Sequence, residues 1–191
     1  MMAEEDYSRD KGFRRYASAI DRALSIFDTQ LQEWADYISF LGRLLKALQS
    51  HPSTISVVPS KSLVARRLAQ CLSPTLPSGV HQKALEVYSY IFTLITPSGV
   101  ARDLSLYLPG LSPVLSFASL TVRSPFLVLL RQHILPLPPI TLRPACKALI
   151  LTLLPGLEDE GSEDFDSTYK LLNDFRAAFR VDEKQDDGHF W

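Results

Sequence analysis

The sequence has few of the residues and motifs that build covalent, metal or catalytic sites. Its 191 residues include two cysteines, Cys71 and Cys146, and four histidines that are far apart in the chain. No histidine has a second ligand at the spacing of a zinc site, and no GxGxxG, P-loop, HExxH or GxSxG motif is present. Both cysteines lie in apolar helical patterns, which favours buried, reduced thiols over a disulfide. We therefore expect no enzyme, no metal site and no cofactor.

The numbers of basic and acidic residues nearly balance, and long apolar runs are also rare. The chain has 20 basic and 21 acidic residues and a formal net charge of -1, whereas nucleic-acid-binding domains usually carry a basic excess. Its first residues contain no apolar run, so we expect no secretory signal and a cytoplasmic location. The longest uncharged stretch, 104–122, contains proline and glycine, and the apolar run 148–154 is too short to cross a bilayer. The sequence thus predicts no membrane span and no nucleic-acid partner.

Apolar residues at helical spacing are abundant. They make up 46% of the chain, and spacings of three and four residues in every long segment predict helices without strands. On the second helix, which Asp28 or Thr29 is expected to cap, Trp34 is placed on the buried stripe. The expected helices are 10–27, 28–49, 60–72, 78–96, 99–107, 113–119, 124–134, 141–154 and 162–180.

The stretch 68–92 has the clearest pattern. Ser78 follows Pro77 and predicts an N-cap at the start of a helix. His81, in the first turn, is expected to be a packing or hydrogen-bonding residue, because a positive charge is unfavourable there. A helix with so wide an apolar face packs on more than one side, as inner helices of stacked repeats do. The residues expected on this face are Val80, Ala84, Leu85, Val87, Tyr88, Ile91, Phe92, Leu94 and Ile95.

Prolines and serines set the expected boundaries in the second half of the chain. Ser124 and Pro125 predict a helix start, and the proline-rich segment 135–139 predicts an extended joint. Pro144 is placed in the first turn of helix 141–154, which is expected to be the most buried helix after the central one. Ser162 is expected to cap the last helix, so that the following acidic residues stabilise its first turn.

These patterns predict an all-α fold. We expect an irregular antiparallel helical array of the HEAT or armadillo type, and a compact helical bundle is the alternative. Residues 1–9 predict a disordered N-terminal tail, and residues 10–180 predict one helical domain. Residues 181–191 predict a flexible tail that ends in the beginning of a further element, because Phe190 and Trp191 follow a polar run.

Five helix-and-turn segments occur in a characteristic order: EWADYISFLGRLLKALQ, LAQCLSPTLPSGVHQKALEVY, YLPGLSPVL, LRPACKALI and LLPGLEDEGSEDF. Together they resemble the N-terminal region of the Dopey family, over about residues 19–180. The resemblance implies a non-catalytic protein-interaction or scaffold module in membrane traffic, peripheral on Golgi and endosomal membranes. It implies as partners a large HEAT-repeat scaffold protein, an aminophospholipid flippase complex, kinesin light chain and phosphoinositide. Dopey proteins are far longer than this chain, so functions seated elsewhere in the family are not assigned to it.

Two sets of polar residues are candidate binding sites. The first set predicts a protein-partner surface and consists of Gln82, Lys83, Glu86, Glu158, Asp159 and Glu160. In the alternative interpretation, Lys83 and Glu86 only pair with each other and the acidic residues only stabilise the last helix. The second set predicts contact with an anionic membrane surface and consists of Arg14, Arg15, Lys61, Arg66 and Arg67. Its alternative is a solvated surface, and the sequence leaves homo-oligomerisation open.

Overall fold

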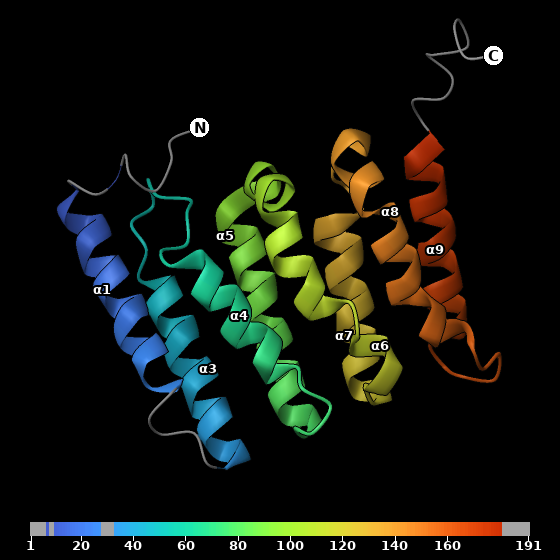
Figure 1. Ribbon diagram of the computed structural model, residues 1–191, viewed down its shortest axis with the longest axis horizontal. Helices are drawn as coiled ribbons and strands as arrows, with labels where there is room; N and C mark the ends of the chain where they lie inside the picture. Colours follow the sequence, from blue (N-terminus) through green and yellow to red (C-terminus); the bar gives the residue numbers. More distant parts are fainter. Residues whose placement is uncertain (1–6, 8–9, 28–32, 181–191) are drawn as a thin grey trace, which may run out of the picture. The chain divides into compact units, whose positions relative to one another are not determined.

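The computed structural model describes residues 7, 10–27 and 33–180, and these residues contain helices and no strands (Figure 1). This confirms the predicted all-α helical array. The predicted tails at 1–9 and 181–191 lie outside the described residues apart from Tyr7, and so do Asp28 and Thr29. The helices are α1 (Lys11–Ser25), α3 (Trp34–Gln49), α4 (Lys61–Cys71), α5 (Ser78–Leu111), α6 (Val114–Phe117), α7 (Leu120–Leu129), a π-helix (Leu130–Ile134), α8 (Pro139–Leu153), a 3-10 helix (Leu154–Leu157) and α9 (Phe165–Arg180).

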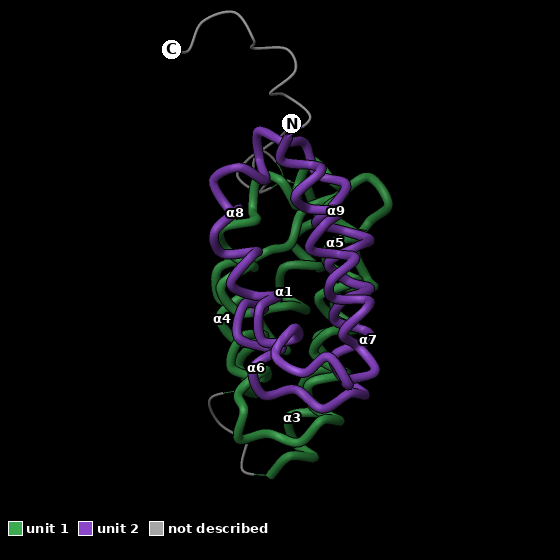
Figure 2. Tube along the Cα trace, turned by 90° about the vertical axis from the view of Figure 1, so that its right-hand side faces the viewer, with its two compact units in different colours: residues 1–110 green, residues 111–191 purple. Residues whose placement is uncertain are grey.

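The chain divides into two compact units, residues 1–110 and 111–191 (Figure 2). In the first unit, α1 packs along α3 and also contacts α4. In the second unit, α8 packs along α9, while α6 contacts α8 and α7 contacts α9. The predicted domain boundaries stay a prediction.

The first part of α5 is the predicted central helix. All nine residues of its predicted apolar face are buried. His81 is also buried, and its Nε2 donates a hydrogen bond of 2.8 Å to the carbonyl of Ser73, which confirms its predicted role. At Thr96 the backbone leaves the helical conformation, with φ of 63° and ψ of 167°. The helix then resumes and continues to Leu111, past the predicted end at 107 and through Pro109.

The start of α3 corrects one prediction. The helix begins at Trp34 after a capping box, in which the Glu33 backbone N–H donates to Asp36 Oδ2 over 2.9 Å. Trp34 is 58% exposed, so its placement on the buried stripe is wrong. Phe40, six residues further on, is the aromatic residue that α3 buries. The first residue of a helix lies at the edge of the packed surface, where even a large apolar side chain reaches solvent.

Three proline positions in the second unit differ from expectation. Pro125 lies inside α7, because the N–H groups of Val122 and Arg123 already donate to the carbonyl of Ser119, the N-cap. Pro144 lies beyond the first turn of α8, which begins at Pro139. Residues 135–137 form a turn, in which the Leu137 N–H donates to the Ile134 carbonyl over 3.1 Å. The predicted extended backbone is found at Pro138, with φ of -56° and ψ of 142°, and Pro139 already belongs to α8. Tertiary packing therefore tolerates proline where helix propensity disfavours it.

The start of α9 also differs from the prediction. The helix begins at Phe165, and Ser162 does not cap it; the Ser162 hydroxyl donates instead to the Asp164 carboxylate. The carbonyl of Asp164 accepts from the backbone N–H of Thr168 over 2.9 Å and so opens the helix. Asp166 is the one acidic residue in the first turn. Most of the acidic run therefore lies in the turn before α9.

Helix α8 is less buried than the sequence predicts. Leu142, Leu149 and Leu153 are fully buried, but Ile140 and Leu151 are 79% and 55% exposed. Among the described residues, one helical stretch, Pro139–Leu157, is long and apolar enough by length and composition to cross a membrane, although the sequence predicts none. Its inner side packs in the second unit and two basic residues lie within it, so we describe it as a helix of that unit.

Candidate anion-binding site

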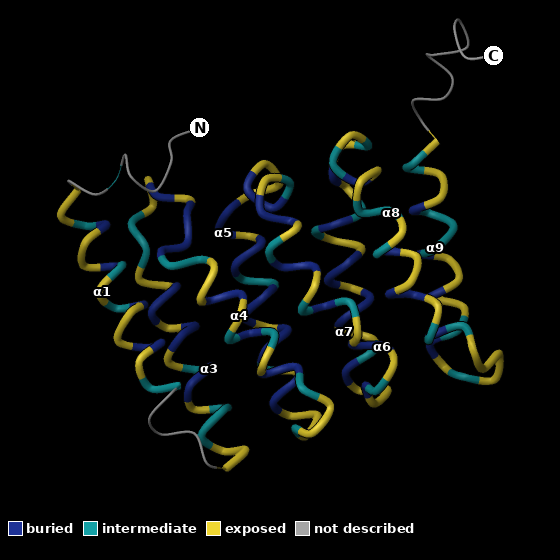
Figure 3. The backbone as a smooth tube through the Cα atoms, in the orientation of Figure 1, coloured by how far each residue is buried: buried dark blue, intermediate teal, exposed yellow. Residues whose placement is uncertain are grey.

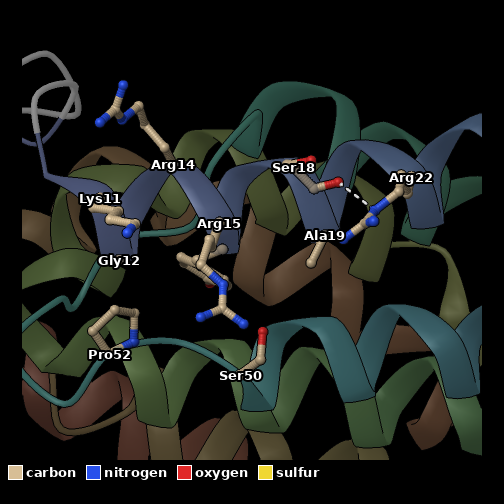
Figure 4. Close-up of a pocket in the computed structure, with 10 residues that line it drawn as sticks. Lys11, Gly12, Arg14, Arg15, Ser18, Ala19, Arg22, Ser50 and Pro52 are labelled. Atoms are coloured by element: carbon tan, nitrogen blue, oxygen red, sulfur yellow. Dashed lines mark hydrogen bonds between the residues drawn. The ribbon is translucent and has the colours of Figure 1, made fainter.

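A cavity of about 850 Å³ lies beside α1 (Figure 4). Four basic side chains line it: Lys11, Arg14, Arg15 and Arg22. The other polar side chains include Ser18 on α1 and Ser50, which follows α3, and no acidic residue is among the described residues that line the cavity. This combination of cations and hydroxyl groups makes a positive, partly enclosed surface.

Helical spacing explains why the basic residues share one side of α1. The apolar residues Phe13, Tyr16, Ile20 and Leu24 recur every three or four positions and are buried. The lysine and arginines occupy the intervening positions and are exposed on the opposite side. Asp10 fixes the start of the helix, because its carboxylate accepts a hydrogen bond of 2.7 Å from the Phe13 N–H.

The opposite wall of the cavity comes from the end of α3. Gly12 permits the close approach, since a Cβ on Gly12 would lie 3.1 Å from Pro52 Cγ. Two hydrogen bonds hold this wall: the Ser50 hydroxyl donates to the Ala47 carbonyl over 2.7 Å, and His51 Nδ1 donates to the Pro52 carbonyl over 2.9 Å. Figure 4 shows Arg15 extending from α1 toward Ser50, whereas Arg14 extends away from Ser50 and Pro52.

The cations of the cavity are available to an anionic ligand. Among the described residues, Lys11, Arg14 and Arg15 have no carboxylate within ion-pair distance. Arg22 donates through Nε to the carbonyl of Ser18 over 3.2 Å, which leaves its terminal nitrogens for other acceptors. Guanidinium groups form bidentate, charge-assisted hydrogen bonds with phosphate and carboxylate groups. The arrangement is therefore suited to a phosphate-bearing ligand.

The remaining predicted lipid-binding residues do not line this cavity. Lys61 Nζ lies 2.6 Å from Asp103 Oδ1, and Arg102 Nη2 lies 2.5 Å from the other oxygen of the same carboxylate. Burial raises the pKa of Asp103, but the hydrogen bonds from Arg102 and Lys61 outweigh it, so this pKa lies below its usual value. Arg67 lies over the ring of Phe27, with 4.5 Å from its Cζ to the ring centroid.

Arg66 is exposed on α4, away from the residues that line the cavity. The structure thus brings Arg14 and Arg15 together with Lys11 and Arg22, and not with the cations of α4. Lys11 and Arg22 could be identified from the sequence, because their spacing from Arg14 and Arg15 places them on the same side of one helix. No sequence signal identifies Ser50, because it comes from another helix.

The predicted protein-partner residues fall in both units. In the first unit, Gln82 and Glu86 are exposed on α5, and Lys83 Nζ lies 2.7 Å from Glu86 Oε2. These two charges therefore pair with each other, as in the alternative interpretation. Their availability to a partner stays a prediction.

The acidic turn is in the second unit. Glu158, Asp159 and Glu160 are exposed, and Asp159 Oδ1 accepts a hydrogen bond of 2.9 Å from the N–H of Gly161. A cavity of about 600 Å³ lies beside this turn. Arg123 also lines it, but its guanidinium is held by Asp164 at 3.3 Å and by two backbone carbonyls. The carboxylates of the turn thus remain open to a basic partner.

The structure describes no cluster that would bind a metal ion. Among the described residues, no group of three or more histidine, cysteine, aspartate or glutamate side chains is close enough to do so. Cys71 is free and buried, as predicted, and burial raises the pKa of its thiol to about 12 despite the nearby Arg67. Cys146 is free but only partly buried. A buried thiol with a raised pKa is a packing residue rather than a nucleophile.

Comparison with known proteins identifies one matching family. The family model described as "Dopey, N-terminal" matches residues 10–191. The chain is 62% identical over 180 residues to protein dop1 of Emericella nidulans, which covers 94% of the chain and 10% of that protein. It is 43% identical over 186 residues to DOP1 of Saccharomyces cerevisiae, a match that covers 95% of the chain and 11% of that protein. It is 46% identical over 169 residues to DOP1B of Mus musculus, a match that covers 88% of the chain and 7% of that protein. None of these names is an enzyme name, and no solved structure matches the chain.

Proposed function

The chain belongs to the Dopey family, and from this premise we propose that it is a non-catalytic, peripheral membrane module of Golgi and endosomal traffic. In this proposal, the cavity beside α1 binds the anionic headgroup of a phosphoinositide at the cytoplasmic face of the membrane. The observation that carries the proposal is the group of four cations around a cavity with no acidic residue among its described lining residues.

Electrostatics supplies the binding energy in this proposal. The exposed side chains of α1 are polar or charged, so the helix offers no large apolar group for insertion into the bilayer. Each lysine or arginine near an anionic membrane contributes about 1 kcal/mol, so four cations contribute up to about 4 kcal/mol. Since surface charges are screened over about 8 Å at physiological ionic strength, the interaction should weaken strongly when salt is added.

Vesicle sedimentation tests the proposal. We expect the chain to sediment with phosphatidylcholine vesicles that contain phosphoinositide and to stay in solution with phosphatidylcholine alone. The double variant Arg14→Glu/Arg15→Glu should weaken binding by at least about 30-fold, because two contributions of about 1 kcal/mol are lost. Both residues are exposed, so the melting temperature should change little.

A matched double variant controls for net charge. Arg66→Glu/Lys170→Glu makes the same change in charge at two exposed positions outside the cavity. This variant should keep most of the vesicle binding. If the two double variants lose binding equally, the cavity is not the site and the attraction is only a property of net charge.

The protein partners implied by the family resemblance are also proposals: a large HEAT-repeat scaffold protein, an aminophospholipid flippase complex and kinesin light chain. The chain spans only 7 to 11% of the length of the three relatives described above. A partner of the whole protein is therefore assigned to this chain only by a binding experiment that uses the chain.

The acidic turn supports a second candidate function, the binding of a basic segment of a partner protein. Its exposed carboxylates lie beside a cavity whose arginine is already paired. The variant Glu158→Lys/Glu160→Lys should weaken capture of the scaffold protein. The exchange Lys83→Glu/Glu86→Lys keeps an ion pair on α5 and tests the other predicted residues. Normal capture by both variants would argue against both predicted partner surfaces.

A further inference from the structure

The outer side of α8 carries apolar residues where a surface helix usually carries polar ones. We call this set the α8 stripe; it consists of Ile140, Arg143, Lys147, Ile150 and Leu151 of α8 and of Leu154, the first residue of the 3-10 helix that follows. Its four apolar residues have exposed fractions from 36% at Ile150 to 79% at Ile140. The residues recur every three or four positions, on the side of the helix opposite to the buried Leu142, Leu149 and Leu153. Figure 3 shows exposed positions recurring along α8.

The exposed residues of α1 differ from those of the α8 stripe, and the difference indicates what kind of surface the stripe is. On α1, the exposed positions hold Lys11, Arg14, Arg15 and Ser18, which are well solvated. Helices that end a stacked array carry such a polar outer face, whereas helices inside an array bury an apolar face against the next repeat. By this criterion α1 has the outer face of a terminal helix, and α8 has the outer face of an internal one.

We propose that the α8 stripe is covered by an amphipathic helix from the remainder of the longer Dopey polypeptide. Relatives of this chain are long enough to supply it, because the chain spans only 7 to 11% of their length. The charge of α8 specifies the covering helix further. The only charged residues of α8 are Arg143 and Lys147, and both belong to the stripe. The covering helix therefore carries acidic residues beside its apolar face.

Two other occupants fit the stripe less well. If α8 packed antiparallel on α8 of a second copy, centred on the middle of the stripe, Lys147 would oppose the same residue of its partner, and like charges in contact are unfavourable. If the stripe entered a bilayer, Lys147 would lie in the middle of the inserted side, whereas interfacial helices keep their cations on the polar face. A helix with acidic flanks pairs with this cation and covers the apolar residues at the same time.

Photo-crosslinking in a long protein tests the proposal. In a chimaera, this chain replaces the matching 180 residues of Emericella nidulans dop1, and benzoylphenylalanine replaces Leu151. We expect a crosslink within the same polypeptide, to one helix outside the replaced segment that has acidic residues near the crosslinked position. Benzoylphenylalanine at Arg66, exposed on α4, is the control and should give no crosslink to that helix. A crosslink from position 151 to lipid, to a second copy or to another protein would overturn the proposal, and so would no crosslink.

A charge variant tests the acidic flank separately. Lys147→Glu in the chimaera should lower the yield of the crosslink from position 151 several-fold. Reversal of the nearest acidic residue of the captured helix to lysine should restore the yield. In the 191-residue chain, Lys147→Glu should leave the melting temperature within about 2 °C of the parent, because Lys147 is exposed and has no described partner. An unchanged crosslink yield in Lys147→Glu would show that the covering helix is not selected by charge.

Discussion

Gly110, near the end of α5, lies close to Ala69 of α4, and its replacement by alanine gives a sharp test of the packing in the first unit. A Cβ at this position would lie 2.6 Å from the Tyr88 hydroxyl oxygen, 2.8 Å from Ala69 Cβ and 3.2 Å from Ala69 Cα. Ala69 is part of α4, so the contact cannot be relieved by rotating a side chain. Gly110→Ala therefore has to displace one helix from the other.

The expected magnitude follows from two opposing effects. Alanine is favoured over glycine by about 1 kcal/mol in a helix interior, and Gly110, the last residue but one of α5, gains at most this amount. Overpacking of a core costs about 1–3 kcal/mol, and two contacts shorter than 3.0 Å place Gly110 toward the upper end of that range. We expect Gly110→Ala to destabilise the protein by about 1–2 kcal/mol. An added Cβ on Gly42, inside α3, would meet no atom within 4 Å apart from neighbouring residues and backbone of its own helix, so Gly42→Ala should gain about 1 kcal/mol.

Urea unfolding followed by circular dichroism measures both variants. The urea midpoint should fall for Gly110→Ala and rise for Gly42→Ala, so the two variants are expected to shift it in opposite directions from wild type. Adding Tyr88→Phe to Gly110→Ala should recover part of the loss, because it removes the closest clashing atom. The Tyr88 hydroxyl is buried with no described hydrogen-bond partner, so its removal sacrifices no hydrogen bond. A wild-type or higher midpoint for Gly110→Ala would refute the close approach of α4 and α5.

Three further predictions concern stability. Val87→Asp should unfold the first unit, because Val87 is fully buried and the charge would have no partner, whereas Gln82→Ala should change stability by at most about 0.5 kcal/mol; equal melting temperatures would contradict this. Thr96→Gly should raise the free energy of unfolding by about 1 kcal/mol, because φ of 63° with ψ of 167° is a glycine conformation; a lower melting temperature would show that the threonine is not strained. The pKa of Asp103 is lower in the folded state than in the unfolded state. The ionised carboxylate therefore stabilises the fold at a pH above its unfolded-state pKa, and this contribution is lost as the pH falls toward its folded-state pKa. Asp103→Asn should therefore destabilise the protein at pH 7, and the urea midpoints of wild type and variant should converge on acidification; a constant difference would refute the ionic origin.

Much of the secondary structure could be predicted because it depends on local spacing. The buried face of the central helix, from Val80 to Ile95, follows residue by residue from the pattern, because apolar residues three and four positions apart lie on the same side of a helix. The kink at Thr96 follows the same logic, because the proline after it interrupts the hydrogen bonds of α5. Family membership could also be read from the sequence, because it rests on the order of several segments.

The sequence alone determined the helical class, the central core face and the basic side of α1, because each depends on residues a few positions apart. The tertiary structure decided which of these surfaces meet. In the folded chain, Ser50 lines the same cavity as the cations of α1, and Lys61 pairs with Asp103, which is 42 residues away in the sequence. Ile140 and Leu151 lie outside the core. Contacts of this kind depend on how helices distant in sequence are positioned, and a local pattern of polar and apolar residues carries no information about that position.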